Sequence, residues 1–300
     1  MKGEFRLEVR RNGLVVHDTG WFDNLILDQG LDRLTNTSPP NAIDFCQVGT
    51  SSTTPAVGQT ALGGYVATNV SRVTVSDVNT GSPNYYVEQI REYTFTLGAI
   101  NTNLAEIGVG WQSGSGGLFS RALIIDGAGS PTTLTVTSSE QLIAYYKISF
   151  RPRLTDAAGT LTLSSVGYAF NSRVASVGSF GGSASNNLFS QQWGPISTGA
   201  FETRGTGASL GAITAGPSGG TAVSTTPTSS VLAAYTPGTF FRDTTITLAA
   251  GIHNPTGGIV TMAISFNMGL RWQWQFTPTA IPKDNTKQMV YGVRLAWARV

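Results

Sequence analysis

Cysteine and histidine are scarce in this sequence, with one cysteine and two histidines among 300 residues. A single thiol cannot build a disulfide framework, and three such side chains are too few for a His/Cys metal cage. A Ser/His/Asp triad would have to use His17 or His253, and no motif surrounds either residue. We expect both histidines at exposed strand ends or in loops, and we expect no metal and no cofactor.

Charged residues are also scarce, at 12% of the chain, with a net charge of +2. Soluble domains carry about a quarter of their residues as charges. The surface is therefore expected to be rich in uncharged polar side chains, or else largely covered by partners. A net charge this small gives little attraction to a phosphate backbone, so we expect no nucleic-acid partner.

Long apolar runs are missing as well. No window approaches the ~18 uninterrupted apolar residues of a membrane-spanning helix. The first six residues, MKGEFR, carry charges where a signal peptide needs an apolar core. The sequence thus predicts no membrane span and a chain made in a cytoplasm.

The amino-terminal segment has the pattern of a β-hairpin. Phe5, Leu7 and Val9 alternate with charged residues, and Asn12-Gly13 then predicts a type I′ turn before a second strand. Leucines at helical spacing between residues 27 and 34 predict one short helix, which Asp23 or Asn24 could cap.

Most of the remaining chain favours strands, because β-branched and aromatic runs are separated by Gly, Pro, Asn and Ser. The expected strands are 94–97, 107–111, 134–136, 142–150, 160–166, 244–248, 259–266, 272–276 and 289–297. The predicted fold class is mainly β, with two related β-sandwich-like domains and one short N-terminal helix.

An internal repeat supports this domain organisation. Four pairs of segments match in the same order: Arg91–Leu97 with Arg242–Leu248, Gln141–Phe150 with Gln288–Trp297, Asn24–Ile26 with Asn187–Phe189, and Leu62–Tyr65 with Leu232–Tyr235. We predict domains at 1–155 and 156–300. A Gly/Ser/Thr-rich stretch at about 205–230 is interpreted as a mobile loop or as an arm that another subunit orders.

Several residues have the chemistry of catalytic or phosphate-binding sites but lack the spacing that such sites need. Cys46 lies in an apolar run and is expected to be a buried hydrophobe. Neither Gly114–Gly117 nor Gly216–Gly220 is followed by the lysine of a phosphate loop. Five glutamates could supply an acid/base pair from distant strands: Glu88, Glu92, Glu106, Glu140 and Glu202. For Glu92 and its repeat counterpart Asp243, a structural ion pair or turn cap is the simpler interpretation.

Aromatic side chains offer two interpretations. Trp272, Trp274 and Phe276 alternate along one strand and so share a face, either as a glycan-binding platform or as part of a core or subunit interface. Adjacent ring pairs cannot both point inward from an extended strand, so one ring of each pair is expected to face a neighbouring sheet or subunit; these pairs are Tyr85-Tyr86, Tyr145-Tyr146 and Phe240-Phe241. A basic carboxy-terminal segment could steer an acidic partner or form a solvated rim; it carries Arg271, Lys283, Lys287, Arg294 and Arg299.

Several motifs resemble virion structural proteins of tailed bacteriophages, of the tail or tail-fibre type. They are VRRNG at 9–13, DTGWFDNLILDQGL at 18–31, VGTS at 48–51 with Thr54-Pro55, EIGVGW at 106–111, LFSRA at 118–122, and the chain end from Ile281. The resemblance implies a non-enzymatic building block located in the virion, in a tail fibre, collar or baseplate. Its partners would be copies of itself and other virion proteins.

Two alternatives stay open beside this interpretation. The first is a receptor-binding fibre domain, which would recognise a host surface glycan or protein. The second is a capsid decoration protein, which would bind heads and raise their resistance to heat.

Overall fold

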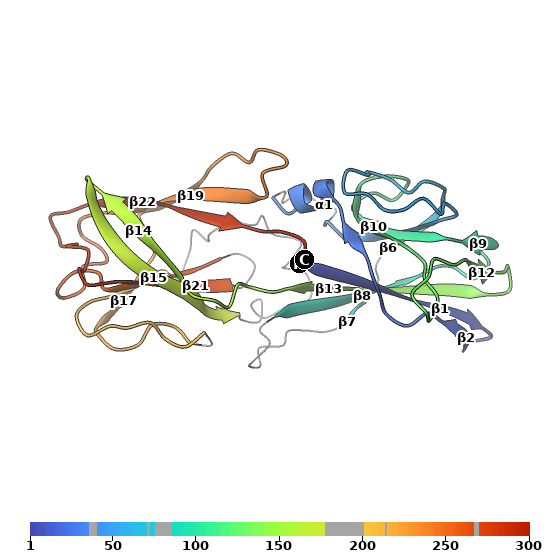
Figure 1. Ribbon diagram of the computed structural model, residues 1–300, viewed down its shortest axis with the longest axis horizontal. Helices are drawn as coiled ribbons and strands as arrows, with labels where there is room; N and C mark the ends of the chain where they lie inside the picture. Colours follow the sequence, from blue (N-terminus) through green and yellow to red (C-terminus); the bar gives the residue numbers. More distant parts are fainter. Residues whose placement is uncertain (36–40, 71–72, 76–85, 178–200, 214, 267–269) are drawn as a thin grey trace.

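The computed structural model describes residues 1–35, 41–70, 73–75, 86–177, 201–213, 215–266 and 270–300. It is 51% strand and 2% helix, built of antiparallel sheets, so the prediction of a mainly β fold is confirmed. The molecule is elongated, with two lobes end to end and both chain ends between them (Figure 1).

The N-terminal lobe contains two main sheets. The first has the order β2 (Leu14–Asp18), β1 (Lys2–Arg11), β13 (Gln141–Phe150), β8 (Val87–Thr94) and β7 (Val73–Val75), with β3 (Phe22–Asp23) also paired to β1. The second has the order β4 (Leu25–Ile26), β11 (Leu118–Leu123), β10 (Glu106–Gly110), β5 (Phe45–Gly49) and β6 (Tyr65–Val70). Helix α1 (Asp28–Arg33) and the pair β9 (Thr102–Leu104) and β12 (Leu134–Val136) complete the lobe.

The alternation of β1 places its apolar side chains in the core. Phe5, Leu7 and Val9 are at most 1% exposed. The β1–β2 turn has positive φ at both Asn12 (50°) and Gly13 (80°), as a type I′ turn requires. The predicted opening hairpin is therefore confirmed.

The C-terminal lobe also contains two sheets. One has the order β14 (Ala157–Leu163), β15 (Val166–Val177), β21 (Leu270–Phe276), β20 (Thr261–Ser265), β16 (Phe201–Arg204) and β17 (Ala222–Ser224). The other is β18 (Ser229–Leu232), β19 (Phe241–Leu248) and β22 (Met289–Ala296). Among the described strands, none of β1–β13 pairs with any of β14–β22.

The two lobes share a strand order. In one pair of sheets, β4-β11-β10-β5-β6 corresponds to β15-β21-β20-β16-β17, and in the other β13-β8-β7 corresponds to β22-β19-β18. The β9–β12 pair corresponds to the bridge between Ile259 and Ile281. One counterpart is missing from the described part of the C-terminal lobe: β13 is flanked by β1, whereas β22 has a strand on one side only.

The repeat predicted from sequence maps onto this correspondence in part. Segment 91–97 begins on β8 and 242–248 lies on β19, while 141–150 forms β13 and 288–297 contains β22. The match of 62–65 with 232–235 is wrong as a structural equivalence, because Tyr65 begins β6 whereas Leu232 ends β18 in the other type of sheet. Residues 187–189 lie outside the described residues. Common descent of the two halves stays a prediction.

Three local predictions need correction. The helix begins at Asp28 with Leu27 as its N-cap and no side-chain cap, because residues 22–26 instead pair with β1 and β11 as β3 and β4. Residues 160–166 form two strands, since Ser164 and Ser165 turn the chain with φ of 47° and 68°. Residues 95–97 follow β8 rather than forming a strand.

The Gly/Ser/Thr-rich segment does not project as an arm. Between β16 and β17 it folds onto the outer face of β21, where Gln273 is fully buried. The Gln273 amide accepts from Gly211 N (2.9 Å) and donates to Ala215 O (3.0 Å). One glutamine thus satisfies several backbone groups that this apolar-poor segment could not satisfy by itself.

Helix α1 joins the two lobes. The Trp297 indole donates to Leu31 O (3.1 Å), and the ring stacks on Tyr235 with centroids 5.9 Å apart. Tyr235 Oη in turn donates to the Asp32 carboxylate (2.5 Å). Burial, followed by this hydrogen bond, raises the pKa of Tyr235 to about 12. An ion pair between Arg299 and Asp28 adds a charged contact between the lobes.

Candidate functional site

The segments 48–64, 106–111 and 118–122 come together around one buried ion pair. Glu106 and Arg121 are both fully buried, with a shortest separation of 2.7 Å between Arg121 Nη2 and Glu106 Oε2. The Glu106 carboxylate also accepts from the backbone N–H groups of Gly64 (2.7 Å) and Ser51 (3.2 Å). Arg121 donates to Thr53 O (2.7 Å). We call this set the Glu106–Arg121 network.

Helix α1 meets the same network through close contacts. Gln29 donates to Leu118 O (2.9 Å) and to Thr60 O (3.0 Å). Gly30 packs so tightly that a Cβ atom there would lie 2.2 Å from Phe119 O. The motifs at 18–31, 48–51, 106–111 and 118–122 are therefore parts of one scaffold that fixes the 50–64 loop.

Three of the five candidate glutamates form ion pairs with arginines of the same chain. Glu106 is held by Arg121, Glu140 by Arg11 (2.7 Å) and Glu202 by Arg271 (2.6 Å). Hydrogen bonds from Thr137, followed by Arg11, lower the pKa of Glu140. Glu92 accepts from Thr94 Oγ1 (2.9 Å), and burial raises the pKa of Glu88. Three of the five are thus placed as ion-pair partners within the chain.

The repeated Arg-acid pairs have structural contacts in both lobes. Arg91 is 2% exposed and donates to Asp44 (2.7 Å), while Arg242 is 8% exposed and donates to Ala233 O (3.1 Å). Asp243 forms an ion pair with Arg294, which lowers the pKa of Asp243.

The two histidines and the cysteine differ in environment. His17 is exposed on β2 and Cys46 is fully buried, as predicted. The prediction for His253 is wrong, because its ring is 1% exposed and packs edge-on against Phe201 with centroids 4.6 Å apart. Burial raises the pKa of the Cys46 thiol and lowers the pKa of His253.

A neutral ring satisfies the hydrogen bonds of His253. Its Nε2 donates to the carbonyl oxygen of Thr225 (3.0 Å), which can only accept. The Thr203 hydroxyl lies 3.1 Å from Nδ1 and can donate to it. A neutral ring therefore satisfies both contacts. The burial of His253 depends on tertiary packing, which brings β16 beside the 249–258 loop.

We expect the stability of the protein to fall as the pH drops below about 6.5, the ordinary histidine pKa. The folded state keeps His253 neutral while the unfolded state takes up a proton, so protonation favours unfolding until the lowered pKa of the folded state is passed. The slope from one group is at most about 1.4 kcal/mol per pH unit. Denaturant unfolding at pH 7.5 and pH 5.5 measures it, with His253→Gln as the matched variant. An equal pH dependence in both proteins would contradict the assignment.

The basic residues of the carboxy-terminal segment are paired within the chain. Arg294 pairs with Asp243, Lys287 with Asp284 and Arg271 with Glu202. Lys283 is 3% exposed, and its ammonium donates to Asn254 Oδ1 (2.6 Å) and to several backbone oxygens. This segment is therefore internally neutralised rather than an open basic patch.

The outward rings of the aromatic pairs are covered by arginines of the same chain. Arg6 lies over Tyr145, 5.7 Å from its centroid, while Tyr146 is fully buried. Arg294 lies over Phe241 at 3.7 Å, and Arg151 lies over Tyr86 at 5.5 Å. Tyr85 lies outside the described residues. We predicted that one ring of each pair faces a neighbouring sheet or subunit. In the structure, these rings instead make cation–π contacts within the chain.

The predicted aromatic stripe lies between the sheets of the C-terminal lobe. Trp272 and Trp274 are half-buried and Phe276 is 2% exposed. Trp272, Trp274 and Trp297 line one cavity of about 470 Å³, and Trp274 and Phe276 line a second of about 310 Å³. The stripe thus faces the interior side of β22, a placement nearer to the core interpretation than to an open platform.

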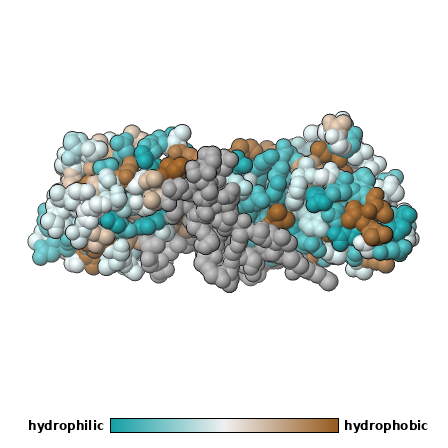
Figure 2. All heavy atoms as spheres, turned by 90° about the horizontal axis from the view of Figure 1, so that it is seen from below, coloured by the Kyte–Doolittle hydropathy of each residue, from teal (hydrophilic) through white to brown (hydrophobic). Residues whose placement is uncertain are grey.

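An apolar sheet edge stands out on the N-terminal lobe. All five residues of β2 are exposed, with Leu14 at 73%, Val15 at 50% and Val16 at 51%. Figure 2 shows apolar atoms gathering at the far end of this lobe, the end at which Figure 1 places β2. Sheet edges are commonly protected by lysine or proline, and Leu14–Asp18 contains neither. We call these three aliphatic residues the β2 edge.

No helix among the described residues is long and apolar enough to cross a bilayer. Within the same ranges, no group of three or more His, Cys, Asp or Glu side chains is placed to hold a metal ion.

Comparison with protein families, with curated proteins and with solved structures found no match to this chain.

Proposed function

We propose that this protein is a non-enzymatic structural component of a bacteriophage virion, in its tail, and that it acts through protein–protein assembly. The observation that carries the proposal is the β2 edge, where three aliphatic side chains are exposed and where β2 pairs with β1 alone among the described strands. Such an edge is a template for pairing with another chain, and burying it would remove an aggregation hazard. The resemblance of several motifs to tail and tail-fibre proteins supports a place for this assembly in a phage tail.

The two alternatives predict different placements. A glycan-binding fibre domain would use Trp272 and Trp274 as an open platform, and their half-buried position between the sheets gives that role little surface. A decoration protein would lie on the head rather than on the tail.

Adding positive charge to the β2 edge tests the proposal. We expect Leu14→Lys combined with Val16→Lys to change the free energy of unfolding by no more than about 0.5 kcal/mol per site, because both side chains are mainly in solvent. The variant should fail to enter particles when it replaces the native chain in an infected cell. Immunoblots of purified particles measure incorporation.

Leu97→Lys is the matched control, since Leu97 is 60% exposed and follows β8, which β1 and β13 separate from β2 in the sheet. Normal incorporation of the double variant would remove the β2 edge from the proposal.

A further inference from the structure

The C-terminal lobe has a second open strand edge, on β22, which is separate from the β2 edge. In the N-terminal lobe, β1 pairs with β13 over nine residue pairs, from Lys2 with Ser149 to Arg10 with Gln141. In the C-terminal lobe, β22 occupies the position of β13 and pairs with β19 alone among the described strands. Among the described strands, the C-terminal lobe therefore has an open strand position that β1 fills in the N-terminal lobe.

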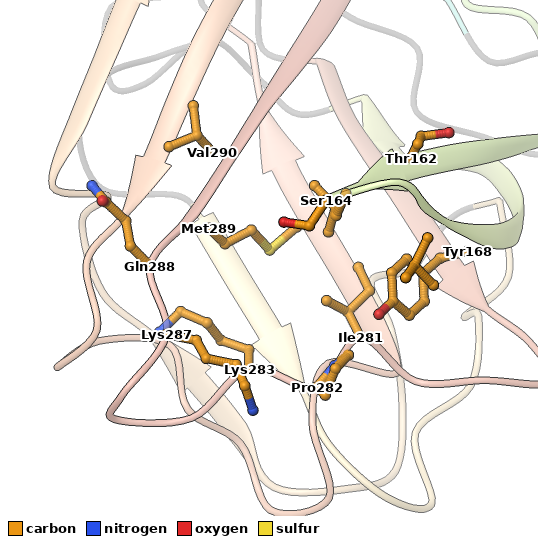
Figure 3. Close-up of a pocket in the computed structure, with 12 residues that line it drawn as sticks. Thr162, Ser164, Tyr168, Ile281, Pro282, Lys283, Lys287, Gln288, Met289 and Val290 are labelled. Carbon is orange, nitrogen blue, oxygen red and sulfur yellow. The ribbon is translucent and has the colours of Figure 1, made fainter.

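Cavities follow this open edge along its whole length. At the start of β22, Met289 and Val290 line a cavity of about 510 Å³ together with Leu163, Val166 and Tyr168 of the β14–β15 hairpin. Figure 3 shows Met289 pointing toward this hairpin, which also contributes Thr162 and Ser164. The cavities of about 310 Å³ and about 470 Å³ continue along Tyr291–Arg294 and Arg294–Ala298. We call these three cavities along β22 the β22 groove.

The inward side chains of β22 are less well covered than those of β13. Leu142, Ala144, Tyr146 and Ile148 of β13 are 0–1% exposed. On β22, Met289, Tyr291, Val293 and Leu295 are 4–8% exposed. This difference in exposure is expected, because β1 covers the edge of β13 and no described strand covers the edge of β22.

Two polar details point to an extended backbone in the groove. Tyr291 is buried, and its hydroxyl has no hydrogen-bond partner in the described part of the chain, although it lines the middle cavity. Beyond the carboxyl end of β22, Met1 N donates to Ala298 O (2.7 Å) and Val300 N donates to Met1 O (2.9 Å). The edge that continues β22 thus already accepts extended chain where the groove ends.

We propose that the β22 groove is an acceptor site for one extended segment of another protein, with large apolar side chains at alternate positions. The pattern comes from β1, whose Phe5, Leu7 and Val9 fill the equivalent place while the residues between them are charged. An added strand would pair its backbone with β22 and place its apolar side chains between β22 and β21. Its backbone carbonyls could accept the Tyr291 hydroxyl. Parts of β14 lie within 8 Å of β22 between Cα atoms, so β14 would move outward to admit the added strand.

The proposed partner rests on the assembly role proposed above. The binding site itself is tested with purified protein. The probe is a fluorescent peptide with the sequence of residues 2–11, KGEFRLEVRR, titrated with the full chain and followed by anisotropy. The control peptide has serine in place of Phe5, Leu7 and Val9. We expect the first peptide to bind saturably and the second to bind at least about tenfold more weakly.

Matched variants locate the binding. Leu161→Glu places a charge on β14 beside the middle cavity and should weaken binding about tenfold. Leu97→Glu adds the same charge at an exposed position in the other lobe and should leave binding unchanged. If Leu161→Glu fails to fold, hydrogen exchange of the native chain decides, because bound peptide should slow exchange of β22 amides.

Three results would overturn the proposal: no saturable binding, equal binding of both peptides, or protection outside β22. Self-association that Leu161→Glu abolishes would also overturn it, because a second copy would then fill the groove. None of these results depends on where the protein lies in a particle, so the site and the proposed function can fail separately.

Discussion

Replacing Arg121 by methionine is expected to lower the free energy of unfolding by about 3–5 kcal/mol. The substitution leaves Glu106 fully buried with its charge uncompensated, and methionine cannot donate to Thr53 O or to Gln59. The 50–64 loop should lose order with it, because that loop is anchored to Glu106 by Ser51, Gly63 and Gly64. Denaturant unfolding measures the loss, and limited proteolysis reports on the loop.

An exposed ion pair provides the comparison. Arg294→Met breaks the Asp243–Arg294 pair, whose side chains are 42% and 56% exposed, and should cost about 1 kcal/mol or less. Adding Glu106→Gln to Arg121→Met should recover part of the loss, since the buried charge is then removed. Equal effects of Arg121→Met and Arg294→Met would show that the Glu106–Arg121 network does not stabilise the fold.

Replacing Trp297 by alanine is expected to cost about 3–5 kcal/mol. Trp297 is 6% exposed, stacks on Tyr235 and donates to Leu31 O across the junction of the lobes. Its loss should therefore weaken the contact between the lobes as well as the C-terminal core. Calorimetry should show a lower Tm and a broader transition, as the lobes begin to unfold separately.

Trp297→Phe separates the contribution of the buried ring from that of the hydrogen bond to Leu31 O. Phenylalanine keeps most of the buried ring and loses the hydrogen bond to Leu31 O, so its cost should be about 1–2 kcal/mol. A loss below about 1 kcal/mol for Trp297→Ala would place this ring at the periphery.

The strands and turns could be predicted where the local pattern decides. The alternation of Phe5, Leu7 and Val9 and the Asn12-Gly13 turn depend on neighbours in sequence, and both are found. The cap at Asp23 failed because that residue pairs with Glu4 on β1 and lies 2.9 Å from Lys2, contacts between elements that no local pattern contains. Burial of His253 and Gln273 likewise arises from segments far apart in sequence.

The repeat shows how far sequence spacing can reach. Aligning 91–97 with 242–248 and 141–150 with 288–297 places equivalent strands together, and each pair is antiparallel in its own lobe. The register differs, since Ile143 opposes Thr94 whereas the aligned Val290 opposes Thr247 rather than Thr245. A shift of two residues keeps the same side chains facing inward, so the apolar pattern alone could not reveal it.

The candidate glutamates illustrate the limit for functional sites. Glu106 looked equally fit for acid/base work and for structure, because the sequence does not say which cation will lie beside it. The fold places it against Arg121, fifteen residues along the chain on the neighbouring strand β11. The open edge of β22 was also beyond sequence reasoning, because it appears only when the strand orders of the two lobes are compared.

The proposed tail role is tested most directly by looking for this protein in intact phage particles. Gold-labelled antibodies against the chain, viewed by electron microscopy on purified particles, report that position. Label along the tail is the predicted result. Label on the head, or particles that carry none of the chain, would contradict a structural role in the tail.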